Sequence, residues 1–284
     1  MKALRVQSGN GFSLKIVIDK KGPAYMDTQA EKFSVTRITE ESRSKTDMSV
    51  AKEFLFTIFF NGRELVTLMC SPGQLEYLAA GFLFSEGLIN RKDQIKKIEI
   101  DKWLGTGKIE IEGDLPGDSR FLSSRLITSG CGGGATFFDV SDAAIEKVSS
   151  SMQVSAGKIF DLVRKFQHSS ELYLATHGVH SAALADNTDL FILSEDVGRH
   201  NAVDKIFGRC LLENISTSDK MLVSSGRISS EIIQKVAKRG MPIVVSISPP
   251  TSLGIKAAEN FGITLVGSVR GKTMNVYTND WRVR

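Results

Sequence analysis

The sequence is poor in cysteine, with three among 284 residues and no regular spacing. An odd, irregular set argues against a disulfide framework and favours a reducing compartment. Long apolar runs are also missing, because none approaches the roughly 20 residues that a membrane span requires. Residues 1–5 lack the apolar stretch of a secretory signal. We therefore predict a cytoplasmic protein with no membrane partner.

The chain also lacks a large excess of either positive or negative charge. The chain has 36 Lys and Arg against 32 Asp and Glu, a net charge of +4, and its basic residues are scattered among acids. This pattern argues against nucleic acid as a partner and fits an anionic small ligand or an acidic protein. Hydrophobic residues make up 42% of the chain, which is ordinary for a globular protein with one large or two modest domains.

The first third of the chain is predicted to form an α+β unit. Residues 1 to about 50 are polar with little periodicity, so an irregular or partly strand-forming lead-in is expected, with order beginning at Glu53. Apolar runs at 54–60 and 64–69 flank Asn61-Gly62, which is a strong signal for a two-residue hairpin turn.

A helix should follow this hairpin. Ser71 is a candidate N-cap, Pro72 suits the first helical position and Gln74 completes a capping box. Apolar residues at helical spacing then run to a stop near Gly87. Two more strands, at 95–100 and 108–112, complete the predicted unit.

The second half begins with an amphipathic helix at 158–167 and two strands, at 181–185 and 190–194, around an Asp186-Asn187 turn. From residue 221 onward, short apolar strands alternate with helices. The strands are at 221–224, 243–247 and 263–266, and the helices are capped by Ser229 and Thr251 and end at Gly240 and Gly262. This alternation predicts a parallel sheet with right-handed crossovers.

Ligands of such sheets bind at the carboxyl ends of the strands. The segments at these ends, 224–227, 248–252 and 267–272, carry hydroxyl groups or glycine. Arg227, Arg270 and Lys272 are therefore interpreted as ligands of a phosphate. Ser229 and Thr251 are better explained as helix caps.

A dense polar cluster occupies 195–201 at a strand-to-helix junction. Asp196 can be explained as a helix cap, which leaves Arg199 and His200 as candidates to contact a substrate. His177 and His180 have the i, i+3 spacing of metal ligands, but the glycine between them opposes a regular helix and nothing completes a ligand set. We expect no bound metal, and we interpret His180 as an acid/base or polar group near the site.

Cys131 lies among glycines in the segment 128–134. Glycine at that density costs folding entropy and suits a mobile tip or close approach of another molecule. Cys70 and Cys210 instead belong to apolar segments. Cys131 is thus either a reactive thiol or a cysteine carried by a glycine-rich turn, and the local sequence leaves both interpretations open.

Several longer motifs carry a resemblance to a known family. They are 83–89, 178–180, 195–205, 225–231 and 265–270. In this order they resemble the FdhD family of formate dehydrogenase accessory sulfurtransferases, from about residue 50 to Tyr277.

The resemblance implies a fold, a function and a site. The expected fold is α/β, or α+β overall: a smaller N-terminal α+β domain at 1–120, a flexible loop at 121–140 and a cytidine-deaminase-like three-layer α/β/α domain at 141–284. Proteins of the family accept sulfur from a cysteine desulfurase as a persulfide. They deliver it to the molybdenum or tungsten bis-guanine-dinucleotide cofactor of formate dehydrogenase, and they act as homodimers.

The family's sulfur-carrying cysteine corresponds to Cys131 here. Its loop that contacts the guanine nucleotide corresponds to Ser268, Val269, Arg270, Gly271, Lys272 and Thr273. We add to this candidate site the basic residues that follow or begin the predicted strands, which are Arg227, His180, Arg199 and His200.

The sequence departs from the family at one position, because the second cysteine of the usual Cys-Gly-x-Cys loop is Gly134. One thiolate still suffices to accept and release a sulfane sulfur, whereas a disulfide within the loop is impossible. Two other functions stay open: a cofactor-binding chaperone with an inert Cys131, and a zinc hydrolase of deaminase type. The sequence lacks the His-x-Glu and Pro-Cys-x-x-Cys pattern of the latter.

Overall fold

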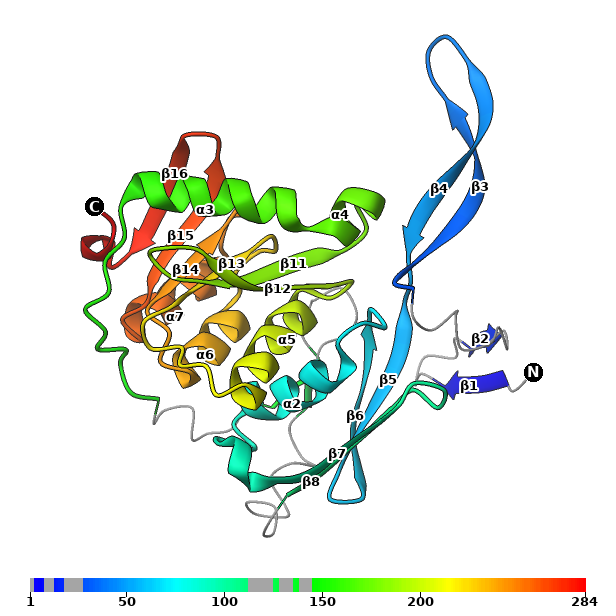
Figure 1. The fold of residues 1–284 in the computed structure, drawn as a ribbon, viewed down its shortest axis with the longest axis horizontal. Coiled ribbons are helices and arrows are strands. Elements are labelled where there is room, and N and C mark those ends of the chain that lie inside the picture. The colour runs from blue at the N-terminus through cyan, green and yellow to red at the C-terminus, as the bar shows by residue number, and fades with distance from the viewer. Residues whose placement is uncertain (1–2, 8–12, 18–27, 112–124, 128–134, 138–144) are drawn as a thin grey trace.

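In a computed structural model of the protein, the C-terminal half is built around one six-stranded sheet (Figure 1). The structure describes residues 3–7, 13–17, 28–111, 125–127, 135–137 and 145–284. The strand order is β12-β11-β13-β14-β15-β16. The bounds are β11 His180–Ala185, β12 Leu190–Asp196, β13 Met221–Ser224, β14 Ile243–Ser246, β15 Thr264–Arg270 and β16 Thr273–Thr278.

The sheet is mixed. The three strands predicted to be parallel, at 221–224, 243–247 and 263–266, are parallel and form its centre. β13, β14 and β15 are parallel, whereas β11, β12 and β16 run antiparallel to their neighbours. The reason is the length of the connections. Helices join the three parallel strands, while short turns join β11 to β12 and β15 to β16, and a short turn can connect only antiparallel strands.

Helices cover both faces of this sheet, which makes the predicted three layers (Figure 1). One face packs on α5, α6 and α7, and the other packs on α3. The bounds are α3 Ala156–Ser169, α4 Glu171–Thr176, α5 Arg199–Leu212, α6 Ser230–Lys238 and α7 Ser252–Asn260, with a short 3-10 helix η3 at Asp280–Arg282. Two buried clusters of apolar side chains, one on each side of the sheet, form the core of this half.

The N-terminal unit is a four-stranded sheet of order β6-β5-β8-β7 that packs against one helix, α2. Its elements are β5 Phe54–Phe60, β6 Arg63–Cys70, α2 Leu75–Glu86, η1 Lys92–Gln94, β7 Ile95–Asp101 and β8 Thr106–Ile111. The predicted hairpin turn is confirmed, because Asn61 and Gly62 both have positive φ, at 45° and 78°. The helix ends at Gly87 as predicted, with φ 83°.

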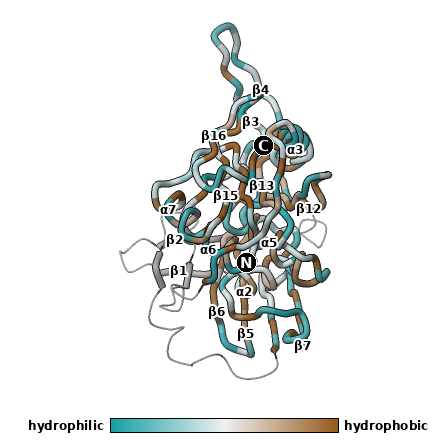
Figure 2. The backbone as a smooth tube through the Cα atoms, turned by 90° about the vertical axis from the view of Figure 1, so that its left-hand side faces the viewer, coloured by the Kyte–Doolittle hydropathy of each residue, from teal (hydrophilic) through white to brown (hydrophobic). Residues whose placement is uncertain are grey.

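Ordered structure begins earlier than the sequence suggests. β3 Ala30–Ile38 pairs with β4 Arg43–Ala51 in a long antiparallel hairpin, so a partly strand-forming lead-in is confirmed, whereas the expectation that order begins at Glu53 is wrong. Figures 1 and 2 show this hairpin extending away from the rest of the molecule. Both of its faces are largely exposed, so its strands lack the alternation that marks a half-buried strand.

Shorter pairs are formed by β1 Ala3–Gln7 with β2 Ser13–Val17 and by β9 Arg125–Ile127 with β10 Ala135–Phe137. The expected domain boundaries near 120 and 140 fall within 112–124 and 138–144, outside the described residues, and stay predictions. No helix in the described part of the chain is long and apolar enough to cross a membrane.

The N-terminal unit contacts the C-terminal half through a close crossing of α2 and α5. A Cβ atom added to Gly81 would lie 1.8 Å from the carbonyl oxygen of Asp204, and one added to Gly208 would lie 1.9 Å from that of Tyr77. Glycine at both positions therefore lets the two backbones approach directly.

Candidate functional site

One edge of the large sheet gathers the ends of several strands. β13 and β14 finish there, at Ser224 and Ser246. Because β11 runs antiparallel to β13, its first residue, His180, lies at the same edge, and it pairs with Asp196 at the end of β12. We refer to these strand ends and the segments that follow them as the strand-end site.

Serine hydroxyl groups hold the backbone of the strand-end site. Ser225 Oγ accepts a hydrogen bond from the backbone N of Ser181 at 2.9 Å and lies 3.4 Å from Nδ1 of His180. Ser248 Oγ donates to the carbonyl of Ser225 at 2.7 Å, and Ser246 Oγ donates to the carbonyl of Gly226 at 2.8 Å. These bonds satisfy buried carbonyls that would otherwise be costly to leave without a donor.

Four of the basic residues expected at a ligand site lie together here. The pKa of His180 is lowered, first by burial and then by the positive charges of Arg199, His200 and, more weakly, Arg227. A Cβ atom on Gly226 would lie 2.9 Å from Cβ of Arg199, so glycine allows this arginine to lie against the strand end. The chain thus brings together residues from three separate segments and builds a positive edge.

His200 already has an acidic partner at this edge. Its Nε2 lies 2.9 Å from Oε2 of Glu231, in the first turn of α6, and both side chains are largely buried. Arg227, by contrast, is exposed and can reach a ligand from solvent.

The segment expected to contact a nucleotide, 268–273, is a β-hairpin instead of a loop. β15 continues to Arg270, Gly271 and Lys272 form the turn, and β16 starts at Thr273. The backbone N of Ser268 donates to the carbonyl of Ser248 at 3.2 Å, which joins the hairpin to the strand-end site.

The side chains of this hairpin differ in exposure. Arg270, Gly271, Lys272 and Thr273 are exposed, whereas Val269 is buried in the core. A ligand could therefore contact only the backbone of Val269.

The polar cluster at 195–201 serves mostly structural purposes. Glu195 accepts hydrogen bonds from the backbone N of Leu172 and Tyr173 at the start of α4. Asp196 does not cap α5, because the N-cap is Gly198, which has no side-chain capping bond. The Asp196 carboxylate is instead buried and occupied by a salt bridge with Lys205.

Sequence reasoning also misplaced Ser71 and missed Lys205. Helix α2 begins at Leu75 with Gln74 as its N-cap in the left-handed region, so Ser71 caps nothing. The Ser71 hydroxyl accepts a hydrogen bond from the backbone N of Val197 at 3.1 Å, which no local rule predicts. Lys205 occupies a buried position of helix α5, and a buried ammonium group requires a carboxylate partner.

A second buried charge cluster lies where α2, α5 and α6 meet. Lys235 Nζ contacts both carboxylate oxygens of Asp204, at 2.8 and 2.9 Å, and Oε1 of Glu86 at 2.9 Å. Burial acts to lower the pKa of Lys235, but the two carboxylates outweigh it and raise the pKa above its ordinary value. This cluster joins the two halves of the molecule, because Glu86 belongs to α2 and Lys235 to α6.

The structure describes the burial of two of the three cysteines. Cys70 and Cys210 are buried. Burial raises the pKa of Cys210 to about 12 and raises that of Cys70 still further. Cys131 lies in the segment 128–134, outside the described residues.

The two histidines considered as metal ligands do not form a site in the described part of the chain. His177 is exposed, ends α4 in the left-handed region and makes an edge contact with the ring of Tyr173. Within the described ranges, no group of three or more His, Cys, Asp or Glu residues could hold a metal ion.

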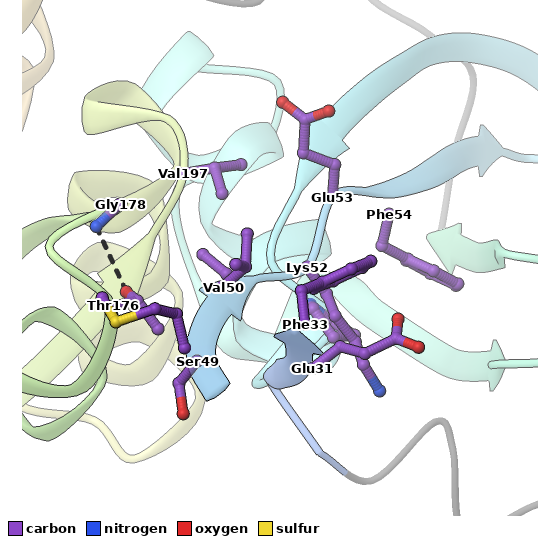
Figure 3. Close-up of a pocket in the computed structure, with 13 residues that line it drawn as sticks. Glu31, Phe33, Ser49, Val50, Lys52, Glu53, Phe54, Thr176, Gly178 and Val197 are labelled. Atoms are coloured by element: carbon purple, nitrogen blue, oxygen red, sulfur yellow. Dashed lines mark hydrogen bonds between the residues drawn. The ribbon is translucent and has the colours of Figure 1, made fainter. Parts of the chain in front are cut away.

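An open pocket of about 650 Å³ lies at the base of the β3–β4 hairpin (Figure 3). Its lining is largely apolar and includes Phe33, Val50 and Phe54 from the N-terminal strands, with Val197 from the segment before α5. Pro72 also lines it. No sequence pattern indicates this pocket, since its lining residues are far apart along the chain.

The fold defines a three-layer α/β protein with basic side chains gathered at the ends of its sheet strands. The family model described as the FdhD/NarQ family matches residues 51–284, and the chain belongs to this family.

Similar proteins agree with this assignment. The chain is 44% identical over 240 residues to the sulfur carrier protein FdhD of Bacillus pumilus, covering 84% of this chain and 91% of that one. It is 41% identical over 251 residues to the sulfur carrier protein FdhD of Bacillus subtilis, covering 88% and 96%. A crystal structure from Desulfotalea psychrophila, provisionally described as a formate dehydrogenase accessory protein, matches with a TM-score of 0.76 at 28% identity, over 90% of this chain and 100% of that one.

Proposed function

We propose that this protein is a sulfurtransferase that carries sulfur as a persulfide on Cys131. It would accept the sulfur from a cysteine desulfurase and deliver it to the molybdenum or tungsten bis-guanine-dinucleotide cofactor that formate dehydrogenase requires. The observation that supports Cys131 most directly is the burial of the other two cysteines. Because the thiolate is the reactive form, raised pKa values make Cys70 and Cys210 poor carriers.

The transfer needs only one thiol of this chain. The Cys131 thiolate would attack the outer sulfur of the donor's persulfide, forming one S–S bond while the donor's S–S bond breaks and its thiolate leaves. This loading step involves no net oxidation, so it requires no oxidant or reductant. Gly134, which replaces the second loop cysteine, is compatible with this step.

A mass measurement tests the carrier role. After incubation with a cysteine desulfurase and cysteine, the wild type should gain one sulfur atom, and Cys131→Ala should gain none. Cys70→Ala and Cys210→Ala are matched controls and should gain sulfur like the wild type, since both thiols are buried. Formate dehydrogenase maturation should be lost only with Cys131→Ala. Sulfur on Cys131→Ala, or full maturation by that variant, would contradict the proposal.

We further propose that the strand-end site and the β15–β16 hairpin bind the guanine nucleotide parts of the cofactor, which is cargo of the protein. Arg270, Lys272 and Arg227 are exposed cations that suit phosphate groups. Arg199 would add positive potential from the strand ends, and His180 and His200 would offer polar contacts. The backbone of 268–273 would provide the remaining contacts.

Calorimetry with GDP tests this site. Arg270→Glu replaces attraction with repulsion and should weaken GDP binding at least tenfold, which corresponds to about 1.4 kcal/mol or more. Arg91→Glu makes the same charge change at an exposed position of the N-terminal unit and should bind GDP like the wild type. Equal affinities of wild type and Arg270→Glu would remove the hairpin from the site.

The remaining partners follow from the same transfer. The donor would be a cysteine desulfurase and the recipient enzyme would be a formate dehydrogenase. This protein would bind both of them in the cytoplasm. The family resemblance also supports a homodimer as the working form. Sedimentation of the purified protein measures that state directly, and a monomer at micromolar concentration would contradict it.

A further inference from the structure

The segment that leads into α5 is held by a buried carboxylate. Asp196 and Lys205 have no exposed side-chain surface, and their Oδ2 and Nζ atoms lie 2.6 Å apart. Asp196 Oδ1 accepts hydrogen bonds from the backbone N of Gly198 and from Nδ2 of Asn201, both at 2.9 Å. Both oxygens are therefore occupied by donors from the segment that carries Arg199.

The N-terminal unit supplies the other half of this arrangement. Ser71, just after β6, donates its backbone N to Asp196 Oδ2 at 3.0 Å and accepts a hydrogen bond from the backbone N of Val197 on its Oγ at 3.1 Å. Its carbonyl lies 3.4 Å from Lys205 Nζ. Three atoms of one residue thus contact a segment 125 positions away in the sequence.

Stability alone is a poor explanation for this network. The desolvation of a buried ion pair offsets much of its attraction, and apolar side chains of similar size often stabilise a fold as well or better. A charged network with every oxygen satisfied instead imposes one geometry on the backbone around it. The backbone in question runs from Asp196 to Gly198 and ends where Arg199 and His200 begin.

We propose that Ser71 and Asp196 are positioning residues, through which the N-terminal unit places Arg199 and His200 at the strand-end site and so sets its affinity for an anionic ligand. This inference rests on the proposed nucleotide site and deepens it. Pro72 and Val197, the residues that follow Ser71 and Asp196, both line the pocket at the base of the β3–β4 hairpin, where Val197 is labelled in Figure 3.

The variant that tests this is Ser71→Ala. It removes the acceptor for the backbone N of Val197 and leaves the buried ion pair in place. Asp196→Asn is less suitable, because it would leave the Lys205 ammonium buried without its carboxylate and could prevent folding. The matched control is Ser194→Ala, which removes a buried hydroxyl two residues before Asp196 that has no hydrogen-bond partner among the described residues. Thermal unfolding verifies that both variants fold.

The first measurement is the affinity for GDP. Ser71→Ala should bind about fivefold more weakly than the wild type, a size typical of coupling between two sites. Ser194→Ala should bind like the wild type. Wild-type affinity in a folded Ser71→Ala would overturn the positioning role.

The second measurement needs no nucleotide. NMR titration reports the pKa of the His180 imidazole, which burial, Arg199, His200 and Arg227 lower and Asp196 raises. The chain has four histidines, so His180→Gln assigns the signal. If Ser71→Ala lets Arg199 move away, the His180 pKa should rise toward its ordinary value, while Ser194→Ala leaves it unchanged.

The two measurements separate the failure of each idea. A wild type that does not bind GDP would refute the proposed nucleotide site, and the His180 titration would still decide whether Ser71 positions Arg199. A His180 pKa that is the same in Ser71→Ala and wild type overturns the positioning role in either case.

Discussion

The crossing of α2 and α5 makes Gly208 a sensitive position. In Gly208→Ala the new Cβ atom would lie 1.9 Å from the carbonyl oxygen of Tyr77 and 2.7 Å from the backbone N of Gly81. Both neighbouring atoms belong to the backbone of α2, so a side-chain rotation cannot relieve the contact. The helices must separate by about 1.5 Å before the contact becomes an ordinary one.

The cost follows from what lies in that interface. Leu211 of α5 belongs to the same buried cluster as Leu78 and Phe82 of α2, and this packing loosens as the helices separate. A gap of about 1 Å already removes up to half of the attraction between facing atoms, and overpacking a core costs about 1–3 kcal/mol. Because rigid backbone resists here, we expect Gly208→Ala to lower the free energy of unfolding by about 3 kcal/mol or more.

Urea unfolding at equilibrium measures this loss. Gly157→Ala is the matched control, since Gly157 also lies in a helix, is exposed and would place its Cβ more than 4 Å from any other heavy atom. Alanine has the higher helix propensity, so this control should be neutral or stabilising by up to about 1 kcal/mol. A free energy of unfolding for Gly208→Ala within about 0.5 kcal/mol of the wild type would refute the close crossing.

Three further predictions concern charge and the thiol. Lys235→Met should lower the free energy of unfolding by about 3–5 kcal/mol in urea, because it leaves Asp204 and Glu86 buried without their cation; a loss below about 1 kcal/mol would contradict the cluster. The pKa of His180 is lowered in the folded state, so the unfolded chain takes up its proton first and stability falls as the pH drops below about 6.5. His180→Gln should reduce that loss in urea titrations at about pH 7.5 and 5.5, and an unchanged pH dependence would show that His180 does not titrate as inferred. Gly134→Cys should leave sulfur transfer about unchanged and add only a tendency toward oxidation, so a large gain of maturation activity under reducing conditions would refute the single-thiol mechanism.

Local signals in the sequence predicted local structure well. Asn61-Gly62 indicated a turn with positive φ at both positions, and the structure has it. Gly87 ends α2, and Thr251 caps α7 by accepting a hydrogen bond from the backbone N of Gly254 at 3.1 Å. Each of these turns and caps depends on interactions within a few residues, so the local sequence is enough to predict it.

The errors arose where a distant partner competed with a local rule. Ser71 had every local property of a helix cap, yet its hydroxyl bonds to Val197, across 126 positions of sequence. Asp196 likewise had the position of a cap for α5 and instead faces Lys205 on the same helix. The buried network gave Ser71 partners that no short window contains, whereas Asp196 bonds both to nearby residues, Gly198 and Asn201, and to the distant Ser71.

The same distinction applies to the candidate site. The sequence by itself determined which chemical groups the protein has: a single thiol among glycines at Cys131, and cations after three predicted strands. Family membership follows from the same information, because motifs and their order are properties of the sequence. What the sequence could not state is which of these groups lie together.

Only the tertiary structure decided that His180, Arg199 and Arg227 share one edge of a mixed sheet, and that the hairpin with Arg270 and Lys272 joins it at Ser248. It also decided that Cys70 and Cys210 are too buried to react easily. The physical reason is range: caps and turns act within a few residues, whereas burial and charge pairing depend on every segment that packs around a group, and only the folded chain specifies those neighbours.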